Sequence, residues 1–438
     1  MVMKSVRETA LEILVRVETD SAYPNILLNS ASSHLPEPDR ALLTELINGT
    51  LKMQGYLDWV LAQFLHKPIQ NLTPWIRNNL RLAVYQHAFL ERIPPYAISH
   101  EAVKLAKRYG HRGVANLTNA VLRRIFRELA SLPLPTEPGT RIAVRNSHPE
   151  WLVRRWIQRW GEAQTQRICQ LNNESPPVTL RVNQLKSIDI GALQQQLNTN
   201  GFLTEPTIHP QFLKVNNPRT LTQSTLYHRG FFYIQDPVWG WVVDLLDPQP
   251  GEAILDYCSA PGGKTTYIAE RMQNTGTLVA LDVHAHRLNR VRENCQRLGI
   301  TSVRCHLVTE WTPSIQFDRI LVDVPCSGLG VLRRRADLRW KHTEADLSQF
   351  ATLQLNILNA AAAHLKPNGI LVYSTCTTEP EENEAVIHTF CQQHPHFIIE
   401  PATTGVYGAT EDKDGTLHVI PNQHSTDGAF AARLRRHE

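Results

Sequence analysis

Strands alternate regularly with helices over the second half of the chain, and this alternation constrains the fold more than any other feature. Short apolar runs rich in β-branched residues predict strands near residues 253–257, 278–283, 303–308, 320–324 and 370–374. Longer stretches whose apolar residues recur with helical spacing lie between and after these strands. Such alternation produces a mostly parallel, doubly wound sheet, so we expect an α/β, Rossmann-like fold here.

The chain has 438 residues, more than one domain usually holds. Residues 1–130 carry only helical patterns and predict an all-helical domain. Residues 131–145 are expected to be a linker, because three prolines within 131–140 exclude a helix there. A long helix followed by a β–α–β pattern predicts a small α+β subdomain over 146–234, which leaves 235–438 for the doubly wound domain.

Local signals mark several helix ends. Thr73 before Pro74 predicts a cap followed by proline at the first helical position. Asp39 and Ser99 are expected to cap two other N-terminal helices, and Pro367–Gly369 to end the helix before the last strand of the predicted set.

Composition narrows the class of protein. The longest apolar runs are far too short to span a membrane, and charges interrupt the N-terminus, so neither a membrane partner nor a signal peptide is expected. The seven cysteines are odd in number and lack a Cys-x-x-Cys pair, which argues against a disulfide scaffold and a zinc ribbon. We therefore expect a cytoplasmic protein without a metal.

Net charge is only +4, but one segment is strongly basic. Between Ala102 and Arg127 there are seven Lys or Arg residues and no Asp or Glu. An ordinary solvated surface is one explanation. The absence of any acid over this length favours the alternative, a patch that binds nucleic-acid phosphates.

Two predicted strands end on thiols. The run Ile320–Gly328 delivers Asp323 and Cys326 to the end of its strand, and the strand after Gly369 ends on Cys376. In open α/β sheets the chemistry lies at the carboxyl ends of the strands. The two strands are neighbours in this sheet class, so both thiols are expected in one pocket.

A glycine-rich turn, residues 258–266, follows the predicted strand at 253–257. It invites comparison with a phosphate-binding P-loop. Cys258 stands where that loop needs its first glycine, which argues against it. Asp256 can instead meet an amino group, and Asp282 at the end of the next strand can bind ribose hydroxyls. Without the Gly-x-Gly-x-x-Gly pattern for a pyrophosphate, S-adenosylmethionine fits better than NAD.

Three motifs carry a family resemblance: Cys-Ser-Ala-Pro-Gly-Gly-Lys at 258–264, Asp-Val-Pro-Cys-Ser-Gly at 323–328 and Tyr-Ser-Thr-Cys at 373–376. They resemble the signature motifs of the RNA cytosine-C5 methyltransferases of the Nop2/Sun family, over roughly residues 150–438. The first 130 residues resemble the NusB-like RNA-binding domain. This combination is similar to the bacterial enzymes that modify 16S ribosomal RNA.

The resemblance implies a class I S-adenosylmethionine-dependent methyltransferase. Cys376 would attack C6 of cytosine and Cys326 would assist product release, while Asp323 would touch cofactor and base. A free thiol needs activation to attack, and Lys264 or a helix N-terminus could supply it. Many members carry a Gly-Asp pair that contacts the adenine where this chain reads Val308-Thr309-Glu310, so Thr309 or, with a shift of one residue, Glu310 would take that place. The residues implied for the cofactor are Cys258, Ser259, Ala260, Pro261, Gly262, Gly263, Lys264, Asp282, Thr309 and Asp323.

The expected partner is single-stranded or looped 16S rRNA, since a base must leave its stack to enter such a pocket. The protein is expected to be a monomer. Five basic residues follow Cys326 and are expected to hold the flanking phosphates: Arg333, Arg334, Arg335, Arg339 and Lys341. Alternatives stay open: a methyltransferase of transfer RNA or of another rRNA site, an amino-group methyltransferase, or a non-catalytic RNA-binding factor.

Overall fold

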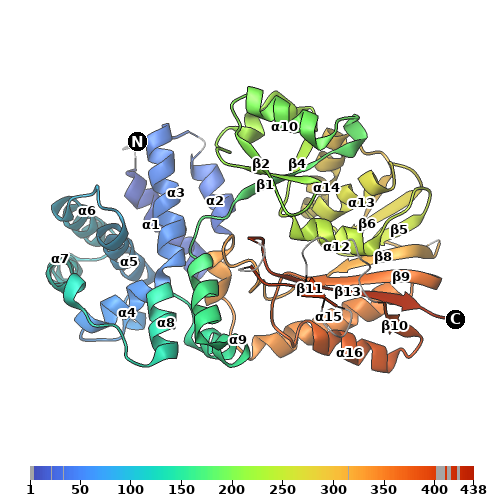
Figure 1. Cartoon of the computed structure of the whole chain (residues 1–438). Coiled ribbons are helices and arrows are strands. Elements are labelled where there is room, and N and C mark those ends of the chain that lie inside the picture. The colour runs from blue at the N-terminus through green and yellow to red at the C-terminus, as the bar shows by residue number, and fades with distance from the viewer. Residues whose placement is uncertain are drawn as a thin grey trace. The chain divides into compact units, whose positions relative to one another are not determined.

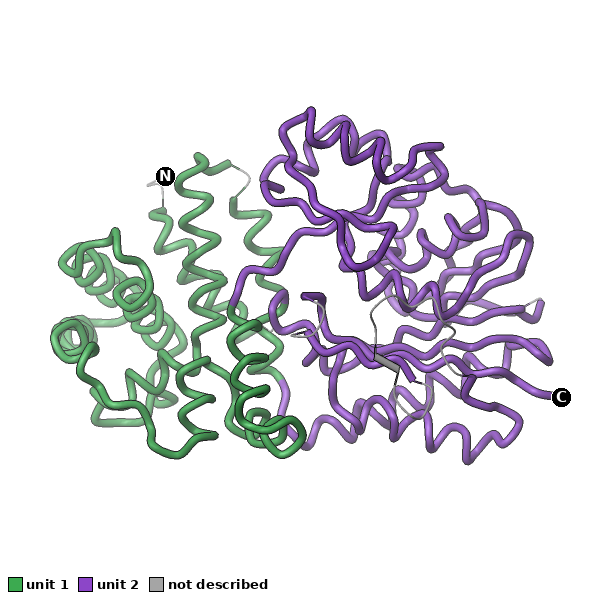
Figure 2. The backbone as a smooth tube through the Cα atoms, in the orientation of Figure 1, with its two compact units in different colours: residues 1–173, 335–341 green, residues 174–334, 342–438 purple. Residues whose placement is uncertain are grey.

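The computed structural model describes residues 4–20, 22–32, 34–313, 315–400, 410–411, 416–421 and 425–438. The chain forms two compact units (Figure 2): residues 1–173 with 335–341, and residues 174–334 with 342–438. In the described part of the chain, no helix combines the length and apolarity that crossing a membrane requires.

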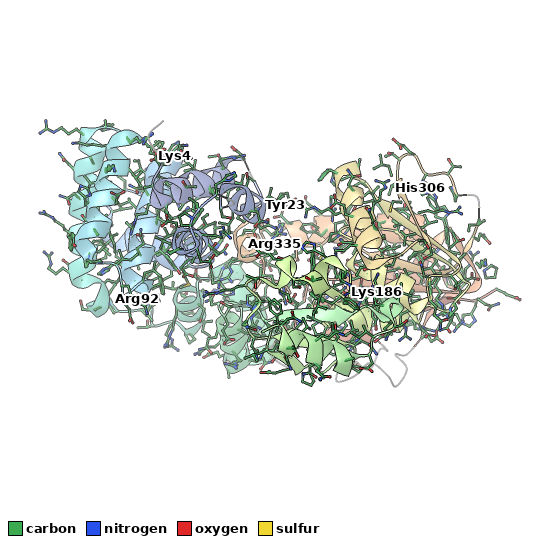
Figure 3. All side chains as sticks on the ribbon, turned by 90° about the horizontal axis from the view of Figure 1, so that it is seen from above. Lys4, Tyr23, Arg92, Lys186, His306 and Arg335 are labelled. Atoms are coloured by element: carbon green, nitrogen blue, oxygen red, sulfur yellow. The ribbon has the colours of Figure 1, made fainter. Side chains whose placement is uncertain are left out.

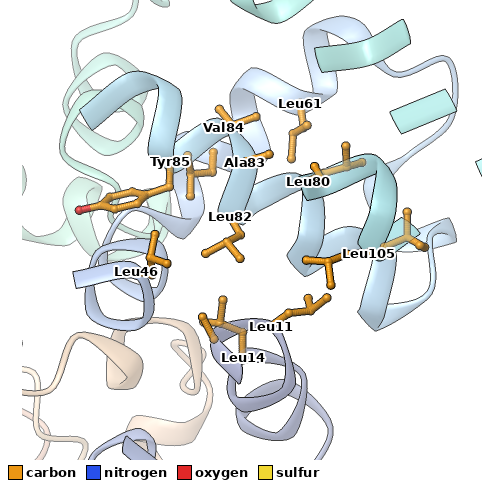
Figure 4. Packing of buried hydrophobic residues seen from close by; sticks show 14 of the residues in the cluster. Leu11, Leu14, Leu46, Leu61, Leu80, Leu82, Ala83, Val84, Tyr85 and Leu105 are labelled. Atoms are coloured by element: carbon orange, nitrogen blue, oxygen red, sulfur yellow. The ribbon is translucent and has the colours of Figure 1, made fainter. Parts of the chain in front are cut away.

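The first unit is helical. Its elements are α1 (Val6–Thr19), α2 (Pro24–Ser32), α3 (Glu37–Lys52), α4 (Gln54–Phe64), η1 (Ile69–Asn71), α5 (Pro74–Phe89), α6 (Pro95–Arg108), α7 (Arg112–Glu128), η2 (Leu129–Ser131), α8 (Pro138–Asn146), α9 (Glu150–Leu171) and η5 (Ala336–Trp340). Helix α5 is central, because every residue from Asn78 to Gln86 is buried. Its Leu80, Leu82 and Val84 pack with leucines of the neighbouring helices (Figure 4).

The second unit holds two sheets. The smaller, with order β2-β3-β1-β4, is antiparallel and consists of β1 (Val178–Val182), β2 (Thr204–Pro206), β3 (Phe212–Val215) and β4 (Phe232–Ile234). Helices α10 (Ile190–Thr199) and α11 (Thr225–His228) and the turns η3 (Gln184–Lys186) and η4 (Leu221–Gln223) accompany it. This is the α+β pattern that the sequence predicts for the segment.

The larger sheet has the order β11-β12-β13-β9-β8-β5-β6-β7, and β10 pairs with β13. Its strands are β5 (Ala253–Asp256), β6 (Thr277–Asp282), β7 (Val303–Leu307), β8 (Phe317–Asp323), β9 (Leu365–Thr375), β10 (Phe397–Ile399), β11 (Thr410–Glu411), β12 (Thr416–Val419) and β13 (Ala429–Arg436). The five consecutive strands β7, β6, β5, β8 and β9, from one edge of the sheet inward, are parallel. The predicted doubly wound, mostly parallel α/β fold is therefore confirmed.

Helices cover both faces of this sheet (Figure 1). One face packs against α12 (Val238–Leu246), α13 (Gly263–Arg271) and α14 (Ala285–Leu298), and the other against α15 (Asp346–Ala362) and α16 (Glu384–Gln393). The chain runs from β5 outward to β7 and then returns to β8 beside β5. The strand order thus reverses between β5 and β8, where ligands bind in folds of this type.

Several local expectations are wrong. Helix α8 begins inside the expected linker, because Pro138 occupies its first turn and the Glu137 side chain accepts hydrogen bonds from the backbone there. Ser99 lies within α6, which begins at Pro95, where a proline is tolerated because the first N–H groups have no partner in the helix. Asp39 lies in the first turn of α3 rather than at its cap.

Further differences concern the start of β9, elements that were not predicted, and the domain boundaries. Residues 367–369 lie within β9 instead of before it, because Leu365 already pairs with Phe317 and the residues up to Ile370 bulge out of the ladder. Helices α2 and α4 and strand β2 are absent from the sequence prediction. The expected boundaries fall near residues 130, 145 and 234, whereas the compact units change at residue 173, so that α8 and α9 belong to the helical unit.

Candidate functional site

The carboxyl ends of β5, β6, β8 and β9 bring four chemically active side chains to one edge of the sheet. Asp256, Asp282 and Asp323 are the last residues of β5, β6 and β8, and Cys376 follows β9 directly. Because β8 pairs in parallel with both β5 and β9, Asp323 lies between the strand ends of Asp256 and Cys376. The expectation that the Asp323 and Cys376 strands are neighbours is confirmed.

Lys264 and Asp323 form the central ion pair of this edge. The Lys264 Nζ lies 2.7 Å from Asp323 Oδ2, and the Ser374 hydroxyl donates to Asp323 Oδ1 at 2.8 Å. The Lys264 ammonium also lies over the Trp239 ring, 3.8 Å from its centroid. Asp323 is therefore held by a cation and a hydroxyl in one orientation toward the sheet edge.

The two thiols meet at this edge. Cys326 Sγ and Cys376 Sγ are 3.1 Å apart, and the Cys376 backbone N–H donates to Cys326 Sγ at 3.3 Å. The hydrogen bond to Cys376, together with burial, raises the pKa of the Cys326 thiol well above its usual value. Burial and the neighbouring thiol thus disfavour a thiolate on Cys326.

The turn before α13 brings backbone close to the sheet edge. Gly262 caps the helix with a positive φ of 101°, a conformation that favours glycine. A Cβ added at Gly262 would lie 3.2 Å from the Cα of Val291, so a side chain would crowd α14. Ser259 anchors the turn through its backbone N–H and its hydroxyl, which donate to Leu281 O at 2.8 and 3.0 Å.

Asp256 lies beneath this turn and is almost completely buried. The Thr265 hydroxyl donates to its Oδ2 at 2.6 Å, while Oδ1 has no hydrogen-bond partner. Burial raises the pKa of Asp256 to about 7. A buried carboxylate oxygen without a partner is suited to receive a cationic amino group from a ligand.

Asp282 has a different environment. Its Oδ1 accepts from the His284 backbone N–H at 2.9 Å, and its Oδ2 lies 3.4 Å from the guanidinium of Arg287. Arg287 in turn donates to Ala260 O at 3.0 Å, which connects this carboxylate to the glycine-rich turn. Thr309 is exposed in the turn after β7, directly after Val308, whose N–H donates to Asp282 O at 3.2 Å.

A cavity of about 350 Å³ opens at this edge. Its lining residues are Thr179, Tyr233, Ile234, Gln235, Asp236, Trp239, Asp256, Cys258, Ser259, Ala260, Pro261, Gly263, Lys264, Asp323, Arg334 and Asp427. It thus collects the glycine-rich turn, Asp256 and the Lys264–Asp323 pair. Cys326 and Cys376 do not line it, and Asp282 and Thr309 lie outside it as well.

A second charged group lines the same cavity: Arg334, for which the sequence suggested a phosphate contact, pairs here with two aspartates that were not expected. Arg334 donates to Asp236 Oδ2 at 2.8 Å and to Asp427 Oδ2 at 2.7 Å. Burial and the neighbouring Asp236 raise the pKa of Asp427 to about 7. The only hint in the sequence is that Asp236 follows Gln235 at the start of the last domain.

Another missed residue is Arg181, which is completely buried at the second position from the end of β1. Its guanidinium pairs with the equally buried Glu270 at 2.7 Å and donates to Gly263 O at 2.9 Å. It also contacts the Gln235 side chain. Arg181 therefore fixes the start of α13 and so the position of Lys264.

The five basic residues that follow Cys326 do not form one RNA-facing group. Arg339 is 1% exposed and donates to the carbonyls of Ser147 and Asn172 within the helical unit. Arg335 and Lys341 both pair with Asp337, and Arg333 donates to Ser175 O. For Arg339 the expected phosphate contact is wrong, because its guanidinium already donates hydrogen bonds to buried carbonyl groups.

The basic segment of the helical unit is also partly neutralised. Arg108 pairs with Glu8 at 2.9 Å, and Lys104 lies 3.8 Å from Glu101. Of the other cations, Arg123 and Arg127 border a groove of about 650 Å³ between α6 and α7, and Arg127 also pairs with Glu128. Its lining residues are Pro95, Tyr96, Ser99, His100, Val103, Asn119, Arg123, Phe126 and Arg127.

Among the described residues, no group of three or more His, Cys, Asp or Glu side chains is placed to hold a metal ion.

Comparison with known proteins gives consistent matches along the whole chain. The family model described as "16S rRNA methyltransferase RsmB/F" matches residues 243–435. The model of the NusB family matches residues 4–127, and the ferredoxin-like domain of the "Methyltr_RsmF/B-like" proteins matches residues 148–222.

Relatives of full length are similar as well. The chain is 40% identical over 445 residues to the "Probable ribosomal RNA small subunit methyltransferase B" of Bacillus subtilis (strain 168), covering 99% of both chains. It is 34% identical to the "Ribosomal RNA small subunit methyltransferase B" of Yersinia enterocolitica, covering 98% of both.

Solved structures share the fold. That of the protein PH0851 has a TM-score of 0.83 and 26% identity, and the match covers 99% of this chain and 100% of that one. A methyltransferase homologue from Pyrococcus horikoshii has a TM-score of 0.58 and 31% identity over 67% of this chain and 97% of its own.

Proposed function

Because the chain belongs to the family of 16S rRNA methyltransferases RsmB/F, we propose that it methylates C5 of a cytosine in 16S rRNA through a covalent cysteine adduct. The observation that carries the proposal is the pair of thiols, Cys326 and Cys376, 3.1 Å apart beside the Lys264–Asp323 ion pair. An enzyme that methylates an exocyclic amine needs no thiol, whereas C5 of cytosine is a poor nucleophile and needs one.

The residues of the turn fit S-adenosylmethionine. Asp256 offers its unpartnered Oδ1 to the amino group, Gly263 lines the cavity with backbone alone, and Asp282 is suited to the ribose. Thr309, exposed beyond β7, is the candidate for the adenine. When bound, this cofactor supplies the electrophilic methyl group.

The thiols divide the chemistry between them. The Cys376 thiolate would add to C6, which places electron density on C5 and lets it take the methyl group. The C5 proton would then pass to a base or to water, while the C6–S bond breaks and its electron pair restores the Cys376 thiolate. Cys326, whose Sγ lies 3.1 Å from Cys376 Sγ, assists the elimination that frees the product. Asp323, oriented by Lys264 and Ser374, faces the base edge.

The proposal also names the surface that holds the RNA. Between α6 and α7, Arg123 and Arg127 border a groove with Tyr96, which is 78% exposed, and Phe126. Guanidinium groups beside accessible rings bind single-stranded RNA by phosphate contacts and base stacking. This groove is the candidate anchor for RNA that flanks the target base.

Two single substitutions test the chemistry. Cys376→Ala should abolish methylation of 16S rRNA, and Cys326→Ala should accumulate a covalent protein–RNA adduct that is visible as a shifted band in a denaturing gel. Cys391→Ala, a half-buried cysteine of α16, is the control and should methylate normally.

Bisulfite sequencing of 16S rRNA identifies the modified base. A full rate with Cys326→Ala and no adduct would reverse the assignment of the two thiols. An unchanged bisulfite pattern in cells that lack the protein would refute cytosine methylation altogether.

A further inference from the structure

Glu382 is a buried carboxylate that the chemistry above leaves without a role. It lies between β9 and α16 and is fully buried. Its Oε2 accepts from the Ser327 backbone N–H at 2.9 Å and from the Gln354 amide at 2.8 Å, and the Ser327 hydroxyl donates to its Oε1. A fully buried carboxylate is costly, so these three donors need a reason to be collected here.

Two of these donors belong to Ser327, in the loop that carries Cys326, and the third, Gln354, lies on α15. Ser327 directly follows Cys326, and its hydroxyl also lies 2.9 Å from the hydroxyl of Thr377, which directly follows Cys376. The bridge Glu382–Ser327–Thr377 therefore joins the residues next to both sulfur atoms. Because the bridge joins residues adjacent to the two cysteines, its hydrogen bonds constrain the distance between the two sulfur atoms.

Further bonds hold the same bridge from the other side. The Gln354 amide that reaches Glu382 also donates to Pro325 O at 3.1 Å, so the residue before Cys326 is fixed as well. The Tyr373 hydroxyl donates to the Glu382 backbone carbonyl at 2.6 Å. Gly330 N–H donates to Cys376 O at 2.9 Å, which adds a second connection between the two loops.

Charge acts in the same direction as geometry. The groups that face Cys326 are the Cys376 thiol, the Glu382 carboxylate and the Tyr373 hydroxyl, and Glu379 lies close to Glu382. A negative charge on Glu382 opposes a second negative charge on Cys326. Cys326 is thus disfavoured as a thiolate by the same carboxylate that holds its loop.

We propose that Glu382 is a positioning residue that keeps Cys326 a protonated donor to Cys376, so that the attacking thiolate forms on Cys376 alone. This inference rests on the proposed function for its meaning. Its physical content, the reactivity of the Cys326 sulfur, can be measured without RNA or cofactor.

Alkylation by iodoacetamide measures that reactivity, since only the thiolate forms the S–C bond, with loss of iodide. In a Cys376→Ser background, Glu382→Gln should raise the alkylation rate of Cys326 at pH 8 by about tenfold, the effect of one unit of pKa. The glutamine can keep the bridge, because its oxygen can accept from Ser327 N–H and its NH₂ can donate to the Ser327 hydroxyl oxygen. The experiment therefore removes charge rather than support.

Glu381→Gln removes the same charge from the adjacent, partly exposed glutamate and should leave the rate unchanged. Glu382→Asp keeps the carboxylate on a shorter side chain, so Cys326 should stay slow to react. Equal rates in the parent and Glu382→Gln would overturn the proposal. So would fast alkylation of Glu382→Asp, which reports an opened loop and decides the matter even where Glu382→Gln does not fold.

Turnover gives the second readout. With Cys376 restored, Glu382→Gln should lower kcat about tenfold and leave the KM for RNA unchanged, because the bridge touches neither RNA nor cofactor. An unchanged kcat would contradict the positioning role. If the unaltered chain fails to methylate RNA, the proposed function fails, while the alkylation result still decides whether Glu382 controls Cys326.

Discussion

Three aspartates end neighbouring strands of the large sheet, yet their surroundings give them different tasks. Asp323 is bound by Lys264 and Ser374, Asp282 by a backbone N–H and Arg287, and Asp256 by the Thr265 hydroxyl alone. A carboxylate whose two oxygens both have partners in the protein can orient a site. A carboxylate with one unpartnered oxygen can also bind a ligand. This difference makes Asp256 the most sensitive reporter of ligand binding.

Asp256 should make the stability of the free protein depend on pH. Its pKa of about 7 when folded lies above its ordinary value, so its contribution to stability is complete below about pH 4 and is lost as pH rises through 7. Asp256→Asn should therefore reduce the fall in melting temperature between pH 6 and pH 8. The fall at issue corresponds to at most about 1.4 kcal/mol per pH unit for one proton.

Asp247→Asn serves as the control, because that carboxylate is about half exposed beyond α12. Part of the pH dependence should persist in Asp256→Asn, since Asp427 also has a pKa of about 7. Identical slopes for Asp256→Asn and the unaltered chain would show that Asp256 is not protonated in the free protein.

At the scale of elements, the loops around the thiols are packed backbone against backbone. A Cβ added at Gly330 would lie 2.5 Å from Gly428 O and 2.8 Å from Cys376 O. Gly428 N–H donates to Gly330 O at 2.8 Å, so neither chain can move aside without losing a bond. The loop after β8, the end of β9 and the start of β13 are thus joined at one point.

Gly330→Ala should destabilise the second unit by about 2 kcal/mol, the usual cost of forcing a methyl group into packed surroundings, and should lower methylation. Chemical denaturation measures the first effect. Gly191→Ala in α10 is the matched control, because its nearest neighbour is 3.4 Å away and alanine favours a helix. A tolerated Gly330→Ala would mean that the loops separate at little cost.

Helices α6 and α7 are the elements expected to bind flanking RNA. Arg123→Glu should raise the KM for RNA about tenfold, leave kcat at saturating RNA unchanged and reduce the salt dependence of binding by about one counterion. Fluorescence anisotropy with a single-stranded 16S fragment measures the affinity. Arg141→Glu on α8 changes an equally exposed arginine of the same unit and should have a small effect.

At the scale of the whole molecule, the chain crosses between its two units more than once. It leaves the second unit after Arg334, contributes residues 335–341 to the helical unit, and returns at His342. Within the helical unit, Arg335 lies over the Tyr23 ring, 5.6 Å from its centroid (Figure 3), and the Trp340 indole N–H donates to Leu51 O at 3.0 Å. Residues 1–173 alone therefore do not complete this unit.

Arg339→Ala should destabilise the helical unit by about 3 kcal/mol, because it leaves the buried carbonyls of Ser147 and Asn172 without a donor. Hydrogen exchange near residues 147 and 172 measures the local effect. Arg335→Ala, at a side chain one-third exposed, should cost less than about 1 kcal/mol. Equal costs for the two substitutions would contradict the anchoring role of Arg339.

The sequence by itself determined the fold class and the positions of the strand-end residues. Apolar period, glycine and proline act over a few residues, so the strands that deliver Asp256, Asp323 and Cys376 were predictable. Errors at Ser99 and Pro138 arose where one local signal was ranked above another, since proline tolerates the first turn of a helix. The motifs also led to the family, which the comparisons confirm.

Which buried polar groups form hydrogen bonds or ion pairs with one another could be read only from the folded structure. Arg339 is bonded to carbonyls of the helical unit, Arg334 to two aspartates of the cavity, and Glu382 to the loop that carries Cys326. These partners lie from 55 to nearly 200 residues apart in the chain. A buried charge is stable only where distant segments supply its partners, and that supply is fixed by packing, not by local sequence.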